Sequence, residues 1–385
     1  MRRRKYGFLF AVLLLSLTSL SPSFDITPSG VRELPGEALL PADPSPGLEK
    51  PDPGPITVGV SMGEKELAQL NQWNEQFMEL NSIEVNIENM EDWDEGSMTE
   101  RLRLGEGPDI LLLDSHYIKP LAIKGLLFPL EAVPSGIPES ALPAGLLPLL
   151  QWNGYQWGIP LDADPYVMVY EAGKEPPEPA AYREQRSPLF SIDPADPYAF
   201  AAAVFAAGGN PEHPGEEETA KLDIPSFSKL LLQESTEEYQ KRIAEGSAEL
   251  APLRIAAASD VNQDWPEGYE VMLLAPDNSG FAPVIQSRSF ALTGGRETSS
   301  TALTWVGAMT QAAARSDEWL SVTGRYSLLS SGTVMDDSAI TPLPAPLAFE
   351  SLETYLQQGA SAQLTFGEPE GFPVYESSIQ QLLSE

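Results

Sequence analysis

The chain has 385 residues, no cysteine, and a formal net charge of −33 from 56 acidic and 23 basic side chains. This length allows two domains, and the lack of cysteine excludes disulfides, thiolate catalysis and cysteine-ligated zinc. The negative charge repels phosphate backbones, so nucleic acid is not an expected partner. Two histidines, His116 and His213, do not support a histidine-rich metal site. We expect no metal and no cofactor.

Residues 1–23 have the pattern of an export segment, because basic residues at positions 2–5 precede an apolar run from Tyr6 to Leu20. That run is shorter than the ~20 residues that span a bilayer, and it is typical of a secretory signal. We therefore expect an exported bacterial protein, located outside the cell or at its surface. Cleavage as a signal peptide and retention as an N-terminal anchor both stay open, because Pro22 lies within the stretch where cleavage would occur.

Residues 24–55 are expected to be a linker. They contain eight prolines and no helical or alternating apolar pattern. Proline removes backbone donors and favours an extended chain. A semi-rigid spacer and a disordered tail are both compatible with this composition.

From residue 56 onward, strand patterns alternate with helix patterns. Short β-rich or alternating runs predict strands, and apolar residues at helical spacing predict helices. In chain order, these elements are a strand at Ile56–Val60, a helix with a buried stripe of Leu67, Leu70, Trp73, Phe77 and Leu80, a strand at Ile83–Ile87, a helix at Trp93–Leu104, and a strand at Ile110–Leu113. Such alternation predicts a parallel sheet with crossover helices.

Four polar or ring side chains follow the last of these strands, at Asp114, Ser115, His116 and Tyr117. Ligands of open α/β sheets bind beyond the carboxyl ends of the strands. For Asp114 and Ser115 we favour capping of the next helix. For His116 and Tyr117 we favour a binding role, because a cap does not need two ring side chains. Packing of Tyr117 on that helix is the alternative.

Five segments between Ile56 and Tyr326 resemble, in the same order, segments of one known family. They are "GEGPDILLLDSHYIKPLAIKGLLFPLE", "WNGYQWGIPLDADPYVMVYEAG", "YAFAAAVFAAGGN", "YEVMLLAP" and "SFALTGGRETSSTALTWVGAM". The family is that of the extracellular solute-binding proteins of ABC importers, family 1, which bind sugars and include maltose-binding protein. Each segment alone is weakly specific, but the ordered set is similar to this family over most of the chain.

The resemblance implies an α/β fold of the periplasmic-binding-protein type, with two interleaved lobes, a hinge and a central ligand cleft. The chain would cross between the lobes near Asp162–Tyr166, Gly280–Val284 and Gly324–Leu328. The implied lobes are residues 56–161 with 284–324 for lobe 1, and residues 162–283 with 325–385 for lobe 2.

The resemblance also implies ligand-binding residues. His116 and Tyr117 lie where maltose-binding protein has a charged pair that binds sugar, and Asp164 lies where it has a hinge glutamate. Asp164 and Asp162 are two residues apart, so they would share a face of an extended segment. With Tyr166 at the end of the first crossing, these positions suggest a carboxylate and aromatic side chains around the ligand. We expect Asp164 to be a cleft residue rather than a core residue.

The second lobe departs from the family pattern. The stretch Ala256–Ser259 reads "AAAS" where the family has an aromatic platform, and Trp265 is the candidate that could replace it. The chain between Lys174 and Tyr198 is shorter than in the family, and the C-terminus follows soon after Phe372. Lobe 2 therefore looks trimmed, and the chain could be a degenerate member.

Enzymatic chemistry is not expected. Asp162 and Asp164 lie too close along one strand to flank a glycosidic bond from opposite sides. The stretch Asp260–Gly268 resembles the start of a calcium loop. The sixth position of that loop is Trp265, where glycine is required, and the twelfth position is Val271, where a bidentate acid is required. No phosphate-binding glycine loop of the Walker or dinucleotide type occurs.

Two functions are compatible with these observations. The first is a monomeric solute-binding protein that captures a carbohydrate-like solute between its lobes and delivers it to the permease subunits of an ABC importer. The alternative is a degenerate, membrane-tethered domain that acts in sensing or partner docking. Bacterial binding proteins often carry a lipid-modified cysteine just after the export segment, and this chain has no cysteine. The missing cysteine, the trimmed lobe and the absent platform favour the alternative.

Overall fold

The computed structural model describes residues 55–90, 95–130, 146–174, 176–177, 188–210, 227–247, 251–263, 268–274, 284–293, 299–315 and 317–328. The predicted export segment, the linker up to residue 54, Trp265 and the C-terminal residues 329–385 lie outside these ranges. Among the described residues, none of the helices combines the length and the apolar character needed to cross a membrane.

Parallel strands form the first part of the sheet, as predicted. Strand β1 (Ile56–Val60) pairs in parallel with β2 (Val85–Asn89) on one side and with β3 (Ile110–Asp114) on the other. The structure adds a later strand, β11 (Ile285–Leu292), which pairs antiparallel with β3. The sheet is therefore mixed, because β11 enters it from a distant part of the chain.

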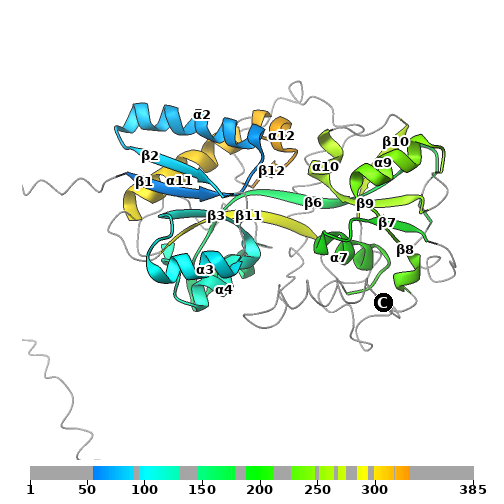
Figure 1. Ribbon diagram of the computed structural model, residues 1–385, viewed down its shortest axis with the longest axis horizontal. Helices are drawn as coiled ribbons and strands as arrows, with labels where there is room; N and C mark the ends of the chain where they lie inside the picture. Colours follow the sequence, from blue (N-terminus) through cyan, green and yellow to red (C-terminus); the bar gives the residue numbers. More distant parts are fainter. Residues whose placement is uncertain are drawn as a thin grey trace, which may run out of the picture. The chain divides into compact units, whose positions relative to one another are not determined.

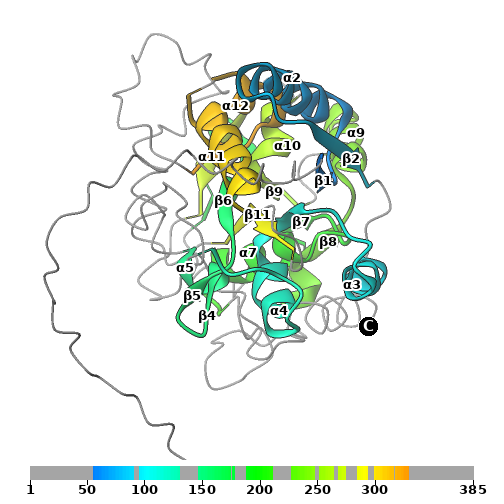
Figure 2. The same cartoon turned by 90° about the vertical axis from the view of Figure 1, so that its left-hand side faces the viewer.

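Helices cover both faces of this part of the sheet (Figures 1 and 2). On one face lie α2 (Glu64–Asn81), α11 (Ser299–Arg315) and α12 (Asp317–Thr323), and on the other lie α3 (Glu95–Leu104) and α4 (Ile118–Ile123). The first four residues of β3 are apolar because they are buried from both sides. Its side chains Ile110 and Leu112 join the core under α2 and α11, whereas Leu111 and Leu113 join the core around α3 and α4.

The predicted stripe of α2 is correct except at its end. Leu70, Trp73 and Phe77 are buried and Leu67 is partly buried against the same core. Leu80, however, is 85% exposed. An 18-residue helix is about 27 Å long, whereas a five-residue strand spans only about 17 Å. The last turn of α2 therefore extends past the strands that bury the rest of the stripe.

A single long strand, β6 (Ile159–Glu171), continues from this part of the sheet into a second one (Figure 1). Its first half pairs with β11 and with the short strand β12 (Tyr326–Ser327). Its second half pairs antiparallel with β9 (Leu253–Ala257) and β10 (Tyr269–Leu273). A small helix, α5 (Leu147–Leu150), and the hairpin of β4 (Gln151–Trp152) and β5 (Tyr155–Gln156) precede β6.

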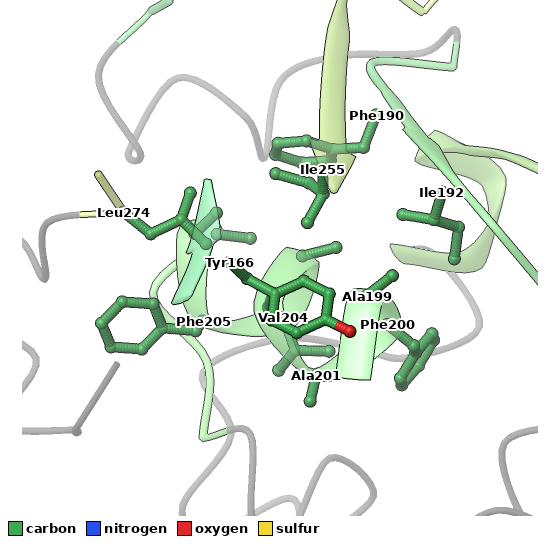
Figure 3. Close-up of a cluster of buried hydrophobic side chains, with 14 of the residues drawn as sticks. Tyr166, Phe190, Ile192, Ala199, Phe200, Ala201, Val204, Phe205, Ile255 and Leu274 are labelled. Atoms are coloured by element: carbon green, nitrogen blue, oxygen red, sulfur yellow. The ribbon is translucent and has the colours of Figure 1, made fainter. Parts of the chain in front are cut away.

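The second part of the fold is also α/β. Strand β7 (Phe190–Ile192) lies between β9 and β8 (Leu231–Gln233) and is parallel to both. Its helices are α7 (Pro197–Ala206), η4 (Ser228–Leu230), α9 (Thr236–Ala244) and α10 (Ala258–Gln263). Helix α7 is buried on all sides, which its small alanine side chains permit. Figure 3 shows Tyr166 of β6 in this core, with its ring against α7.

The chain therefore has the expected α/β, two-lobed fold. The lobes are interleaved, because β11, α11 and α12 follow β7–β10 in sequence but pack with β1–β3 and α2. The residue boundaries of the two lobes, 56–161 with 284–324 and 162–283 with 325–385, stay a prediction.

Candidate functional site

The carboxyl ends of parallel strands from both parts of the fold meet at one place. Strand β3 ends at Asp114, β7 is followed by Asp196 at the start of α7, and β9 is followed by Ser259 at the start of α10. Side chains from these positions are joined by hydrogen bonds to β6 or to one another. Because ligands of α/β sheets bind beyond such strand ends, we take this place as the candidate site.

Asp114 is the centre of the site. Its Oδ1 accepts from the backbone N–H of His116 at 3.1 Å and lies 2.9 Å from His116 Nδ1. Its Oδ2 accepts from the Tyr198 hydroxyl at 2.8 Å and from Gln286 Nε2 at 2.9 Å. These partners come from the short 3-10 helix η1 (Ser115–Tyr117), from α7 and from β11. One carboxylate therefore links the first part of the fold to the second.

The electrostatics of Asp114 follow from these contacts. Burial alone would raise the pKa of its carboxyl, but the contacts with His116 and the hydrogen bond from Tyr198 hold the pKa below the ordinary value. Asp114 is therefore an ionised acceptor at neutral pH. The predicted capping by Asp114 is confirmed by its bond to the His116 N–H. The prediction for Ser115 is wrong, because its hydroxyl bonds to Ser287 and Ser289 on β11.

His116 and Tyr117 occupy different environments. His116 is 6% exposed, its ring meets Tyr198 edge-on, and its Nδ1 lies 2.5 Å from the Tyr198 hydroxyl oxygen. Tyr117 is partly buried and packs against two cores, the one around α3 and α4 and the one around α7. Both side chains therefore lie where the two parts of the fold meet, and their contact with a ligand stays a prediction.

Tyr166 is fully enclosed. It is 2% exposed, stacks on Tyr198 with the ring centroids 6.0 Å apart, and donates to Asp196 Oδ2 at 2.6 Å. The other oxygen of Asp196 accepts from the backbone N–H of Tyr198 and so caps α7. The sequence Asp196-Pro197-Tyr198 thus starts the helix and builds part of the site at the same time.

Asp164 is more buried than expected. It is 0% exposed, and it accepts from the Ser259 N–H at 3.0 Å and from the Ser259 hydroxyl at 2.5 Å. Arg325 Nη2 lies 3.3 Å from its Oδ2. Burial raises the pKa of the Asp164 carboxyl, and Arg325 and Ser259 offset only part of that effect. We therefore correct one expectation: Asp164 belongs to the core, and its removal would affect stability. Its contact with a ligand stays a prediction.

Asp162 shares the same face of β6, as the two-residue spacing predicts. Arg325 approaches both carboxylates, with Nη1 3.5 Å from Asp162 Oδ1. Arg288 binds Asp162 through two nitrogens, at 3.0 and 2.5 Å, and Trp319 donates to it at 3.1 Å. Asp162 is thus a buried charge held by Trp319 and by two largely enclosed arginines, and it supports the site rather than facing a ligand.

Sequence reasoning missed four members of the site: Asp196, Tyr198, Gln286 and Arg325. The Asp-Pro-Tyr sequence before an alanine-rich helix could have revealed the first two, because it has a capping residue followed by an aromatic one. Nothing local marks Gln286 and Arg325, which act through long-range contacts. Trp265 lies outside the described residues. Within the described part of the chain, no cluster of His, Asp or Glu side chains could hold a metal ion.

The stability of the protein is expected to fall as the pH rises through about 6. Burial raises the pKa of Asp196 from an ordinary value of 3.8 to about 6, despite its hydrogen bonds from Tyr166 and from backbone N–H groups. The folded state therefore holds this proton more tightly, so its stabilising effect is complete below about pH 4 and is lost above pH 6. Asp196→Asn, which keeps the cap, should abolish this part of the pH dependence.

Urea unfolding of wild type and Asp196→Asn from pH 4.5 to 7.5 measures this effect. The free energy of unfolding of the wild type should fall relative to that of the variant over this range. A constant difference would contradict the prediction.

The comparison with known proteins places the fold in one class. No protein-family model matches the sequence, and no curated protein matches it. Solved structures do match, and many are maltose-binding-protein-like solute-binding proteins of ABC transporters. The chain has the fold of these sugar-binding proteins.

Three of these structures illustrate the likeness. The maltose-maltodextrin binding protein of Alicyclobacillus acidocaldarius has 16% identity and a TM-score of 0.57, with 86% of this chain and 100% of that chain covered. The Thermus thermophilus maltotriose binding protein has 14% identity and a TM-score of 0.54, with 86% and 94% covered. A protein of xylan utilization in Caldanaerobius polysaccharolyticus has 12% identity and a TM-score of 0.60, with 86% and 95% covered. At such identities, the likeness establishes the fold alone.

Proposed function

We propose that this protein is an exported solute-binding protein that captures a carbohydrate-like solute between its two lobes and delivers it to the permease subunits of an ABC importer. The observation that supports this most strongly is that Asp114 and His116, which follow β3, contact Tyr198 of α7, which stacks on Tyr166 of β6. Several proteins of the same fold have been solved with maltotriose, tagatose, mannitol or cycloalternan.

The chemistry of the site suits a neutral, hydroxylated ligand. The ionised carboxylate of Asp114 accepts from hydroxyl groups, and charge-assisted bonds of this kind are about twice as strong as neutral ones. Aromatic rings offer apolar surface with a polar edge, which matches a sugar ring. Tyr198, whose hydroxyl contacts Asp114, would present such a surface if the lobes separated, whereas Tyr166 stacks on it from within the core. Lobe closure around such a ligand would be a hinge motion driven by tighter binding to the closed state.

One observation favours the alternative function. In this structure, the polar groups of the site bind each other, because the Tyr198 hydroxyl contacts both Asp114 and His116. A ligand that entered between them would have to replace these bonds. A degenerate domain that acts in sensing or partner docking could keep this closed arrangement permanently.

A thermal-shift experiment on the purified full-length protein tests the proposed function. The panel contains maltose, maltotriose, xylotriose, tagatose and mannitol, with ethylene glycol as the control for unspecific stabilisation by polyols. A ligand that binds only the native state at 100 times its Kd stabilises it by about 2.7 kcal/mol. At least one panel member should raise the melting temperature by several degrees at millimolar concentration. A panel without any such shift would favour the degenerate domain.

A further inference from the structure

Gln286 lies between the candidate site and the third crossing segment. It belongs to β11, where its backbone is in register with Asp164 of β6. Its Nε2 donates to Asp114 Oδ2 at 2.9 Å, and its Oε1 accepts from Arg325 Nη2 at 2.7 Å. Arg325 Nη2 in turn lies 3.3 Å from Asp164 Oδ2. One amide therefore joins the central carboxylate of the site to the guanidinium of the hinge.

The neighbours of Gln286 determine which way its amide points. A guanidinium only donates hydrogen bonds, and an ionised carboxylate only accepts them. The oxygen of the amide must therefore face Arg325 and its nitrogen must face Asp114. No other orientation satisfies both partners, and neither an apolar side chain nor an ionised glutamate can replace both contacts.

The position of the Asp114 carboxylate depends on this contact. Its two oxygens are held from different elements, Oδ1 by His116 next to it in the chain and Oδ2 by Tyr198 and Gln286 from far away. The bond from Tyr198 comes from the other lobe and would break when the lobes separate. The bond from Gln286 comes from β11, which pairs directly with β3 and stays beside it.

We propose that Gln286 is a positioning residue, which holds Asp114 in its hydroxyl-binding orientation and ties that orientation to Arg325 in the hinge. This role rests on the proposed function, in which the Asp114 carboxylate accepts hydrogen bonds from the ligand. It assigns to β11 a task beyond sheet pairing. Movement of Arg325 against β6 would then be transmitted to the site through one side chain.

Two variants test this role, Gln286→Met and Gln286→Glu. Methionine has a similar size but loses both hydrogen bonds. An ionised glutamate still accepts from Arg325, but it places a second negative charge beside Asp114, and two carboxylates that share a site raise one of their pKa values strongly. At low pH, one of the two carboxyl groups binds a proton and can donate it in a hydrogen bond to the other. Gln286→Glu should therefore recover as the pH falls, whereas Gln286→Met should not.

The first measurement is NMR of the histidine ring nitrogens in ligand-free, full-length protein. The chain has only two histidines, so a His213→Gln variant assigns the His116 signals. Gln286→Met should shift the His116 signals at every pH. Gln286→Glu should shift them at pH 8 and return them to the wild-type positions at pH 5, each compared with wild type at the same pH. Gln69→Met, a change at another largely buried glutamine, is the matched control and should leave them unchanged.

The second measurement is the melting temperature of the same proteins between pH 5 and 8. The deficit of Gln286→Glu relative to wild type should be largest at pH 8 and at least halved at pH 5, and the deficit of Gln286→Met should stay constant. Unchanged His116 signals in both variants, or a deficit of Gln286→Glu that does not vary with pH, would overturn the positioning role. Both measurements use ligand-free protein, so an absence of saccharide binding would refute the proposed function without affecting them.

Discussion

Asp162→Ala is expected to lower the free energy of unfolding by about 3–5 kcal/mol, which is the usual cost of breaking a buried ion pair by removing one partner. Asp162 is 0% exposed and binds Arg288, Arg325 and the indole of Trp319. Its loss leaves the mostly enclosed guanidinium of Arg288 without its nearest counter-charge and removes one of the two carboxylates beside Arg325. Urea unfolding monitored by tryptophan fluorescence measures the change.

The matched control for this prediction is Glu66→Ala. Glu66 also binds Arg288, at 3.2 Å, but its side chain is 16% exposed and water can partly replace it. Its removal leaves the bonds between Asp162 and Arg288 in place, so its cost should be less than half that of Asp162→Ala. Equal costs for the two variants would contradict the prediction that the fully buried partner of Arg288 contributes more to stability than the partly exposed one.

Gly324→Ala is expected to destabilise the protein by roughly 2–4 kcal/mol, the sum of backbone strain and a steric clash. Gly324 has a φ of +70°, a backbone conformation that is strained for residues other than glycine. A Cβ at this position would also lie 2.7 Å from the Cα of Ser259 and 2.9 Å from its carbonyl oxygen. Backbone atoms cannot move aside as a flexible side chain can, so α10 or the segment around Gly324 would have to shift.

Gly246→Ala separates the two contributions. Gly246 has a φ of +80° and no atom within 4 Å of the position of an added Cβ. This variant should therefore show only the strain, about 1–2 kcal/mol. The difference between the two alanine variants then measures the close approach of Gly324 to Ser259. A similar loss in both would mean that the clash is relieved at no cost.

Local sequence patterns predicted the first part of the fold well. Apolar periodicity located β1, α2, β3 and the parallel pairing, because these elements are buried in ways that their own residues record. The boundaries of β2 moved by two residues, from Ile83–Ile87 to Val85–Asn89. The predicted burial of Leu80 was wrong, because periodicity does not reveal where the sheet under a helix ends.

The site was less predictable than the fold. Position after a strand drew attention to Asp114–Tyr117, but the sequence favoured only capping for Asp114 and could not show that Asp114 receives bonds from α7 and β11. Asp164 was expected to be a cleft residue because the family resemblance places a ligand-binding acid at this position. Ser259, 95 positions later in the chain, encloses it. Such contacts between distant residues leave no local pattern in the sequence.

The interleaving of the lobes has a consequence for how the chain folds. Pairing of β3 with β11 joins residues about 175 positions apart, such as Leu113 and Ser289. Closing a flexible loop of this length costs roughly 4–5 kcal/mol in chain entropy beyond a constant contribution. The strands β7, β8 and β9 close much shorter loops, and they leave the ribosome before β11. We therefore expect the second lobe to acquire its structure first. The sheet of β1, β2 and β3 becomes complete only after β11 has been synthesised.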